Sequence, residues 1–387
     1  MAIQPAAVEY GAADPAERGE SGGSGTHDSE DAGAAGHARS GRVGAAGRVI
    51  RPIRLFALHL ARTLGLFSLA GRLTSGDLRI LCYHGAALAD EHKFRPGLFI
   101  TEATFRRRLQ ILAAGNYPVL SLGEALRHLD EGSLPARATV ITIDDGWYGT
   151  YSIMGPALRE AQLPATLYIA TYYLEKCTQV FNVAAGYILW RAAPQTLDLN
   201  TVGSGLQGVF DLARGEARER AVKVLEAWGD TREATDRQRL LQALCQVVGV
   251  NWVEIETTRQ LQFMTSVEAQ RLGAEGVSLQ LHTHRHRFPR ERSLAEQEIV
   301  DNRQSLGRLS AEPAVHFCYP SGQYSPEQIP WLKELGVRSG VTTKRGLVRS
   351  SSDRFTLPRL LDFETMTELE FEAEISGFND LLHRMLP

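Results

Sequence analysis

From Leu78 onward, short apolar runs rich in β-branched residues alternate with longer stretches whose apolar residues recur at helical spacing. The runs are short enough for strands, and several end directly in Gly, Asp or Pro. This rhythm predicts a parallel sheet with helices outside it, because parallel strands need long crossover connections. We therefore expect an α/β fold whose strands include residues 79–84, 138–143, 165–170, 277–282, 315–319 and 339–342.

Several polar residues mark the ends of the intervening helices. Ser121 and Thr265 each precede a glutamate by three residues, which is the capping-box pattern of a helix start. Thr101 begins another predicted helix, which Gly115 ends. Between that helix and Ser121, residues 117–120 predict a short strand.

The alternation is interrupted between about residues 173 and 262. In this stretch, residues 214–228 and 231–248 have the amphipathic pattern of two helices rich in Arg, Glu and Leu. We interpret it as a mostly helical insertion within a catalytic domain that covers residues 76–378.

The N-terminal part has a different composition. Residues 1–47 are poor in large apolar side chains and rich in Gly, Ala and Ser, so we expect a disordered tail. Residues 48–75 predict an amphipathic helical segment that either packs on the domain or lies on a membrane through residues 51–73. No secretory signal is recognised, so we expect a cytoplasmic, possibly membrane-peripheral, protein.

Charge and cysteine usage exclude other classes. The formal net charge is -3, whereas a nucleic-acid-binding protein needs a strongly basic face, so we expect no nucleic-acid partner. The four cysteines lack CxxC spacing, which argues against a cysteine zinc site or a disulfide framework. Cys82 and Cys318 lie in apolar runs and are interpreted as small buried side chains.

Three groups of residues that carry chemistry follow predicted strands, where ligands of parallel α/β folds collect. The first is Asp144-Asp145-Gly146, where one carboxylate can ligate a metal while the other faces a water. An ordinary polar turn would also account for these three residues. The second holds His282, His284 and His286.

His282 and His286 are four residues apart, so on a helical turn both rings would point the same way and could bind zinc or a similar divalent ion. His284 would then point elsewhere. A solvated histidine-rich loop is the alternative interpretation. The third group is the turn at Pro320-Ser321-Gly322, which could offer a backbone N–H to an oxyanion or be an ordinary turn.

These motifs resemble those of the polysaccharide deacetylases with the NodB-homology domain, including exopolysaccharide-associated members. Thr142-Ile143-Asp144-Asp145-Gly146 is similar to their first motif, and the segment from His282 to His286 to their His-Ser/Thr-x-x-His motif. The Tyr83-His84 pair is also similar to many members. The resemblance covers about residues 78–361 and implies an irregular (β/α) barrel with about seven strands.

The resemblance also implies roles for single residues. Asp144 is the expected general base, and Asp145, His282 and His286 are the expected ligands of a divalent metal, most simply zinc, with cobalt, nickel or manganese as alternatives. The N–H of Ser321 is the expected oxyanion donor. Substrate contacts are expected from Tyr319, Pro320, Tyr324 and Arg359.

The chain departs from the family pattern at two points. The arginine that orients the base in the third motif is Cys318 here, so Arg359 or Asp362 is predicted to replace it. The late Leu-x-His motif that supplies the general acid is matched only by Leu381-Leu382-His383, within a predicted terminal helix. His84 is therefore the rival acid.

The predicted activity is hydrolysis of acetamide groups on the hexosamines of a polysaccharide or oligosaccharide, with release of acetate. Three alternatives remain from the sequence. They are a weakly active or inactive relative that binds polysaccharide during exopolysaccharide synthesis, an amidase for a small non-sugar amide, and a membrane-bound assembly factor.

Overall fold

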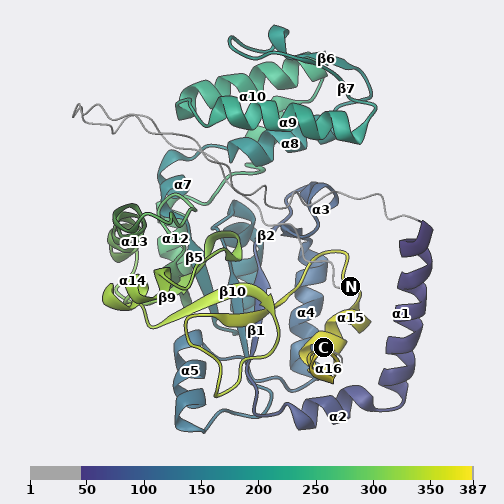
Figure 1. Cartoon of the computed structure of the whole chain (residues 1–387), viewed down its shortest axis with the longest axis vertical. Coiled ribbons are helices and arrows are strands. Elements are labelled where there is room, and N and C mark those ends of the chain that lie inside the picture. The colour runs from purple at the N-terminus through teal and green to yellow at the C-terminus, as the bar shows by residue number, and fades with distance from the viewer. Residues whose placement is uncertain (1–44, 386–387) are drawn as a thin grey trace, which may run out of the picture.

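The structure is a computed structural model, and it describes residues 45–385. Residues 1–44 of the predicted tail lie outside the described residues, and residues 45–47 begin helix α1. The described chain forms a barrel with its helices around it and a helical subdomain above it (Figure 1).

Seven strands close the barrel, and all neighbouring strands pair in parallel. Around the barrel the order is β1, β11, β10, β9, β8, β5 and β4. The fold is therefore the predicted α/β barrel of seven strands. Its strands are β1 (Arg79–Tyr83), β4 (Thr139–Ile143), β5 (Ala165–Ile169), β8 (Val277–Leu281), β9 (His316–Cys318), β10 (Ser339–Arg345) and β11 (Leu357–Leu361).

Burial explains why these runs form the barrel. Every residue of β1, β4 and β5 is buried, as expected for strands covered on both faces. β1 and β4 pair in register from Arg79 opposite Thr139 to Tyr83 opposite Ile143. The two strands therefore end level, and the residues that follow them, His84 and Asp144, leave the barrel side by side.

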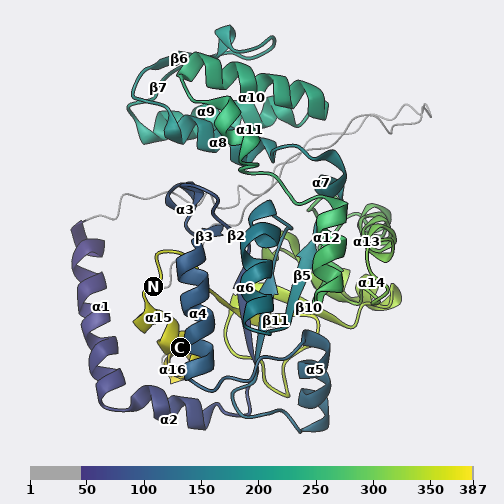
Figure 2. The same cartoon turned by 180° about the vertical axis from the view of Figure 1, so that it is seen from behind.

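Helices cover the outside of the barrel, as the back view shows (Figure 2). The predicted caps are present: the hydroxyls of Thr101, Ser121 and Thr265 accept hydrogen bonds from backbone N–H groups, and Thr265 forms the full capping box. The covering helices are α4 (Glu102–Ala114), α5 (Leu122–Glu131), α6 (Gly155–Glu160), α12 (Ser266–Ala274), α13 (Arg292–Gly307), α14 (Gln328–Glu334) and α15 (Glu368–Ile375).

One predicted strand is absent. Residues 117–120 form only an isolated bridge, between Val119 and Thr139. Pro118 has no N–H to donate, and its carbonyl and the N–H of Leu120 make the two bonds of that bridge. The prediction of a strand was therefore wrong.

The stretch predicted as a helical insertion contains five helices and a small hairpin, and it lies above the barrel in Figure 1. Helices α9 and α10 confirm the two amphipathic patterns. The elements are α7 (Thr171–Lys176), α8 (Phe181–Arg191), β6 (Thr196–Asp198), β7 (Val209–Asp211), α9 (Gly215–Gly229), α10 (Ala234–Val248) and α11 (Trp252–Thr257).

The N-terminal helices α1 (Ala45–Thr63) and α2 (Leu66–Leu73) lie along one side and under one end of the barrel in Figure 1. Within the described residues no single helix is long and apolar enough to span a membrane, although this bent pair passes that test jointly. The remaining elements are β2 (Gly85–Ala86), α3 (Glu91–Phe94), β3 (Phe99–Ile100), α16 (Phe378–Met385), the π-helical turn Thr150–Met154 and the 3-10 turns Leu199–Thr201 and Pro320–Gly322.

Candidate active site

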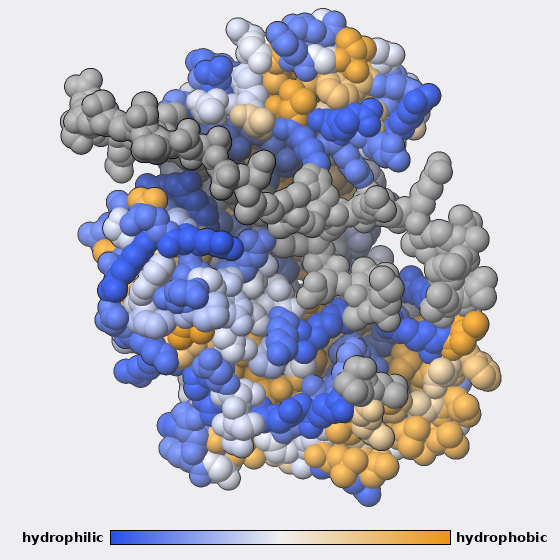
Figure 3. Space-filling view, viewed as in Figure 1, coloured by the Kyte–Doolittle hydropathy of each residue, from blue (hydrophilic) through white to orange (hydrophobic). Residues whose placement is uncertain are grey.

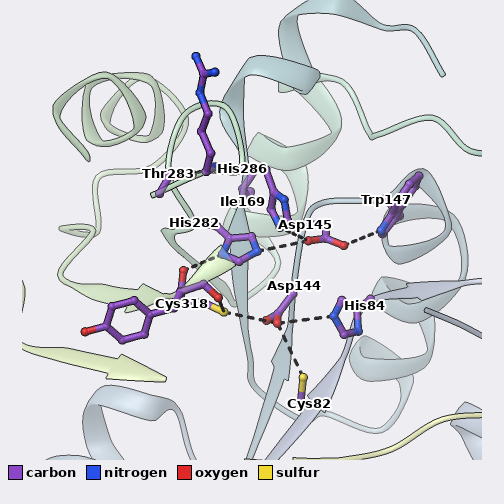
Figure 4. A network of polar contacts seen from close by, with 12 residues as sticks. Cys82, His84, Asp144, Asp145, Trp147, Ile169, His282, Thr283, His286 and Cys318 are labelled. Carbon is purple, nitrogen blue, oxygen red and sulfur yellow. Dashed lines mark hydrogen bonds and ion pairs between the residues drawn. The ribbon is translucent and has the colours of Figure 1, made fainter. Parts of the chain in front are cut away.

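Two adjacent carboxylates follow β4 directly. Asp144 and Asp145 are both buried, with 3 % and 2 % of their surface exposed. Asp145 has a left-handed backbone with φ of 75°, a conformation that aspartate tolerates better than most residues. The left-handed backbone of Asp145 points its side chain toward a different set of partners from those of Asp144, as Figure 4 shows.

Asp145 faces two imidazole rings. Its Oδ1 lies 3.2 Å from Nε2 of His282 and 3.3 Å from Nε2 of His286. Its other oxygen, Oδ2, accepts a hydrogen bond of 2.8 Å from the indole N–H of Trp147. The indole therefore fixes the carboxylate so that Oδ1 points at the histidines (Figure 4).

The two histidines do not lie on a helical turn. Residues 282–286 form a loop after β8, in which Thr283 and His286 have left-handed φ values of 64° and 57°. The predicted helical geometry was therefore wrong, although the loop does bring both rings to one point. His284 points elsewhere, and its Nδ1 lies 3.0 Å from the hydroxyl of Thr171.

Partners outside the motif fix His282. Its Nδ1 lies 2.8 Å from the carbonyl oxygen of Cys318, which can only accept, so Nδ1 carries the proton. Its backbone N–H donates to Oδ1 of Asn302 on α13. Nε2 is therefore the ring atom of His282 that faces Asp145 and is left to bind a cation.

This donor set fits a cation. The ligand atoms of Asp145, His282 and His286 lie within 4.8 Å of one another. Burial lowers the pKa of His286 to about 4, so its ring is neutral near pH 7. Oδ1 of Asp145 only accepts, and each ring can offer it a lone pair from Nε2, so a positive charge among the three groups would hold them together. One carboxylate and two imidazoles are a common set for a catalytic divalent ion.

Asp144 has other partners. Arg359, from β11, donates from Nη1 to Oδ1 at 2.8 Å and from Nη2 to Oδ2 at 2.7 Å. Burial alone would raise the pKa of Asp144, but the charge and hydrogen bonds of Arg359 outweigh it and lower that pKa below its usual value. Asp144 is therefore ionised at neutral pH. One of its oxygens lies within 4.8 Å of a ring nitrogen of His282.

The cysteines that sequence analysis placed in the core lie next to this carboxylate. The Sγ atoms of Cys318 and Cys82 lie 3.4 Å and 3.7 Å from Oδ2 of Asp144. Burial raises the pKa of both thiols, so both keep their protons. Nη2 of Arg359 is also 3.4 Å from Sγ of Cys318. Arg359 therefore contacts the base next to Cys318, the residue that stands in this chain where the third motif has arginine.

Arg359 is fully buried, and its donors bind Asp144, Thr142 and the carbonyl of Thr342. The prediction that it contacts substrate is therefore corrected: it contacts the base. Asp362, the other predicted replacement, instead forms a buried ion pair of 2.9 Å with Arg108.

The candidates for the general acid are placed differently. Nε2 of His84 lies 3.9 Å from Oδ2 of Asp144, and a quarter of its side chain is exposed. His383 lies on α16, which packs against α2 and α15, and its Nδ1 bonds to the carbonyl of Asn379. Only His84 is beside the site.

The third-motif turn follows β9. Ser321 has a left-handed φ of 56° within the turn Pro320–Gly322. Tyr319 and Pro320 are buried, whereas Tyr324 is 41 % exposed, and their contact with substrate stays a prediction. The rings of Tyr319 and Tyr324 stack with centroids 4.8 Å apart.

Sequence reasoning missed Trp147 and Asn302. Trp147 stands two residues after Asp145, so the signal was present in the run Asp-Asp-Gly-Trp. Asn302 lies in the middle of α13, 20 residues beyond His282, and no sequence pattern marks it. It also donates to the carbonyl of Ile169 at the end of β5. Asn302 therefore links the end of β5 to the histidine loop that follows β8.

Comparison with known proteins identifies the domain. Residues 237–340, which include β8, the histidine loop, β9 and the start of β10, match the family model described as polysaccharide deacetylase. This segment is a polysaccharide deacetylase domain. It is therefore a deacetylase of the hydrolase class. No curated protein matches the chain.

The chain is also similar to solved structures. The deacetylase PplD of Streptococcus pyogenes, solved with acetate, has a TM-score of 0.52 and 18 % identity, covering 77 % of this chain and 98 % of that one. IcaB from Ammonifex degensii has a TM-score of 0.49 and 15 % identity, over 78 % of this chain and 97 % of that one. At these identities the likeness to PplD supports the barrel fold alone.

Proposed function

We propose that this deacetylase is metal-dependent and removes acetyl groups from N-acetylated hexosamine units of a polysaccharide or oligosaccharide. The observation that carries the proposal is the position of the two carboxylates. Asp145 completes a cation-binding group, while the adjacent Asp144 is ionised and held by an arginine. Hydrolysis of an unactivated amide needs both an electrophilic centre and a base.

Asp145, His282 and His286 would hold the divalent ion. Zinc suits two imidazoles and one carboxylate, and cobalt, nickel or manganese are alternatives. Such an ion supplies Lewis acidity, which polarises a carbonyl oxygen and lowers the pKa of a water. With three protein ligands, the site would keep a position open for substrate.

Asp144 would act as the general base and accept a proton from the attacking water. Its lowered pKa makes it a weak base but keeps it ionised, and the bidentate contact with Arg359 fixes the orientation of its two oxygens. Arg359 is a positioning residue, because it reaches the reaction only through Asp144.

The other steps would use groups at the ends of β1 and β9. The Ser321 N–H would donate to the oxyanion that forms when the acetyl carbonyl is attacked. His84 would give a proton to the departing amine, since it lies beside Asp144 and is partly exposed. Exposed Tyr324 offers a ring on which a sugar could stack.

The test is acetate release from N-acetylglucosamine oligomers by protein that has been stripped of metal and then given zinc, cobalt, nickel or manganese. We expect release only after a metal is restored. Asp145→Asn should lose both metal and activity, whereas Asp144→Asn should lose activity and keep metal.

Tight metal binding without acetate release from any oligomer would contradict the proposal and favour a polysaccharide-binding relative. Release from small non-sugar amides alone would instead favour an amidase. We also propose a membrane-peripheral location, because α1 and α2 expose large apolar side chains.

A further inference from the structure

The helices α1 and α2 expose an unusual number of large apolar side chains. Of the 17 that are exposed in the described part of the chain, 7 lie between residues 53 and 73. Figure 3 shows apolar surface gathered over these two helices. We call this set the N-terminal apolar face; it consists of Ile53, Phe56, Leu60, Leu64, Leu66, Leu69 and Leu73.

The spacing shows that the face is continuous along each helix. Exposed residues of α1 recur at positions 53, 56, 60 and 64, and those of α2 at 66, 69 and 73. Steps of three and four residues place side chains on one side of a helix. The two helices bend by 74° at their junction, so the two stripes extend in different directions and cover an area rather than a line.

Helix α1 packs on the protein through its opposite side, which carries both arginines and small apolar contacts. Arg54 donates to Glu370 at 2.8 Å, and Arg62 pairs with Glu372 at 2.9 Å, both glutamates lying on α15. Leu58 and Ala61 of α1 pack in a small buried cluster with Phe67 of α2 and Ala373 of α15. Helix α1 therefore contacts α15 through arginines that stay more than half exposed and through Leu58 and Ala61, and it turns its longer apolar stripe toward solvent.

An ordinary surface helix buries its apolar stripe in the core. Here α1 buries Leu58 and Ala61 but leaves Ile53, Phe56 and Leu60 exposed. Large exposed apolar patches on a soluble domain mark a contact surface. An apolar stripe opposite an arginine-bearing side is the pattern of helices that lie in a membrane interface.

Charge points to the kind of surface. Residues 45–73 contain no Asp or Glu and carry five arginines. Arg72 is exposed next to the α2 stripe and makes no ion pair within the described residues. Arg51, Arg54 and Arg62 pair with glutamates of α15, so Arg72 is the cation that the described part of this surface offers to a partner. A second copy would bring two Arg72 side chains together with no acidic residue from positions 45–73 to pair them, whereas anionic lipid headgroups would neutralise them.

We propose that the N-terminal apolar face rests on the anionic surface of a lipid membrane, with α1 and α2 lying in the interface rather than crossing it. The proposal goes beyond the deacetylase reaction and does not depend on it. Each helix alone is too short or too polar to span a bilayer, and the bend lets both lie in one plane.

The test is flotation of the full-length protein with phosphatidylcholine vesicles, with and without phosphatidylglycerol. We expect the wild type to float with the anionic vesicles. Phe56→Asp/Leu64→Asp should lower partitioning by about a hundredfold, because two large apolar side chains lose their burial. Arg72→Gln should lower binding to anionic vesicles by about fivefold, with no effect on neutral ones.

The matched control is Val253→Asp/Leu294→Asp, which places the same charges at exposed apolar positions on α11 and α13. It should float like the wild type, and all variants should release acetate from a soluble substrate at wild-type rates. If circular dichroism shows that the aspartate pair misfolds, Phe56→Ser/Leu64→Ser replaces it, with a smaller expected loss.

Three results would overturn the proposal. One is a wild type that floats with neither kind of vesicle. The second is a folded Phe56→Asp/Leu64→Asp variant that floats like the wild type. The third is a wild-type dimer in solution that this variant disrupts without any change in vesicle binding, which would assign the face to a second copy of the chain.

Discussion

Asp144 and Asp145 are neighbours in the chain, yet they belong to two different parts of the site. Asp145 is held by a loop and an indole and faces two imidazoles. Asp144 points to the barrel interior, where an arginine and two thiols surround it. The left-handed backbone of Asp145 itself separates the two environments. The chain can therefore give one carboxylate to a cation and keep the other as a base.

We expect substitutions around Asp145 to lower activity more than substitutions around Asp144. His282→Ala should lower acetate release by about a thousandfold or more, because a cation contributes several kcal/mol and each 1.4 kcal/mol is tenfold. Bound metal, measured by mass spectrometry, should fall in parallel. His284→Ala, beside it in the same loop, should keep both, and equal losses in the two variants would remove the distinction.

On the Asp144 side, Asp144→Asn should lower kcat by about a hundredfold to ten-thousandfold, the range for loss of a general base. Bound metal should stay at the wild-type level, because the amide keeps the shape of the side chain and Asp145 is untouched. Loss of metal in this variant would show that the two carboxylates act as one group.

Replacing Arg359 should move the pH dependence. Arg359 holds the pKa of Asp144 low, so Arg359→Lys, which loses the bidentate contact, should raise that pKa. The base would then be protonated at higher pH, and the acidic limb of kcat/KM should shift upward, with kcat/KM lowered about tenfold to a hundredfold at low pH.

Arg108→Lys is the matched control for Arg359, because Arg108 is equally buried and pairs with Asp362 instead of the base. It should lower the melting temperature and leave the acidic limb in place. A shift of the limb in both variants would mean that general destabilisation, and not the contact with Asp144, sets the pH dependence.

The smallest expected effect comes from Trp147→Phe. This change removes the hydrogen bond to Oδ2 of Asp145 and keeps an aromatic ring against Phe99 and Phe263. Metal affinity, measured by competition with a chelator, should fall about tenfold, the lower end for loss of a partner that orients a ligand. The pH limb set by Asp144 should not move, whereas a shift would link the two sides.

The sequence by itself determined the barrel and the parts of the site that are local in the chain. Apolar runs such as 139–143 are buried on both faces, and that requirement is written in their composition. Asp144, Asp145 and the histidines stand out because each group lies within a few residues and directly after a strand. Strand ends in parallel barrels meet at one face, so their proximity could be predicted.

Only the tertiary structure decided how those residues are held. Arg359 lies 215 residues from Asp144 in the sequence. Barrel closure pairs β11 with β1, which in turn pairs with β4, and so brings Arg359 to the residue that follows β4. The absence of a motif arginine at Cys318 therefore gave no sign of what replaces it. Likewise, the outward orientation of the α1 stripe follows from contacts with α15, which are ion pairs and the buried cluster of Leu58, Ala61 and Ala373, and no local periodicity shows them. Local pattern sets which side of a helix is apolar, but long-range contacts set which way that side faces.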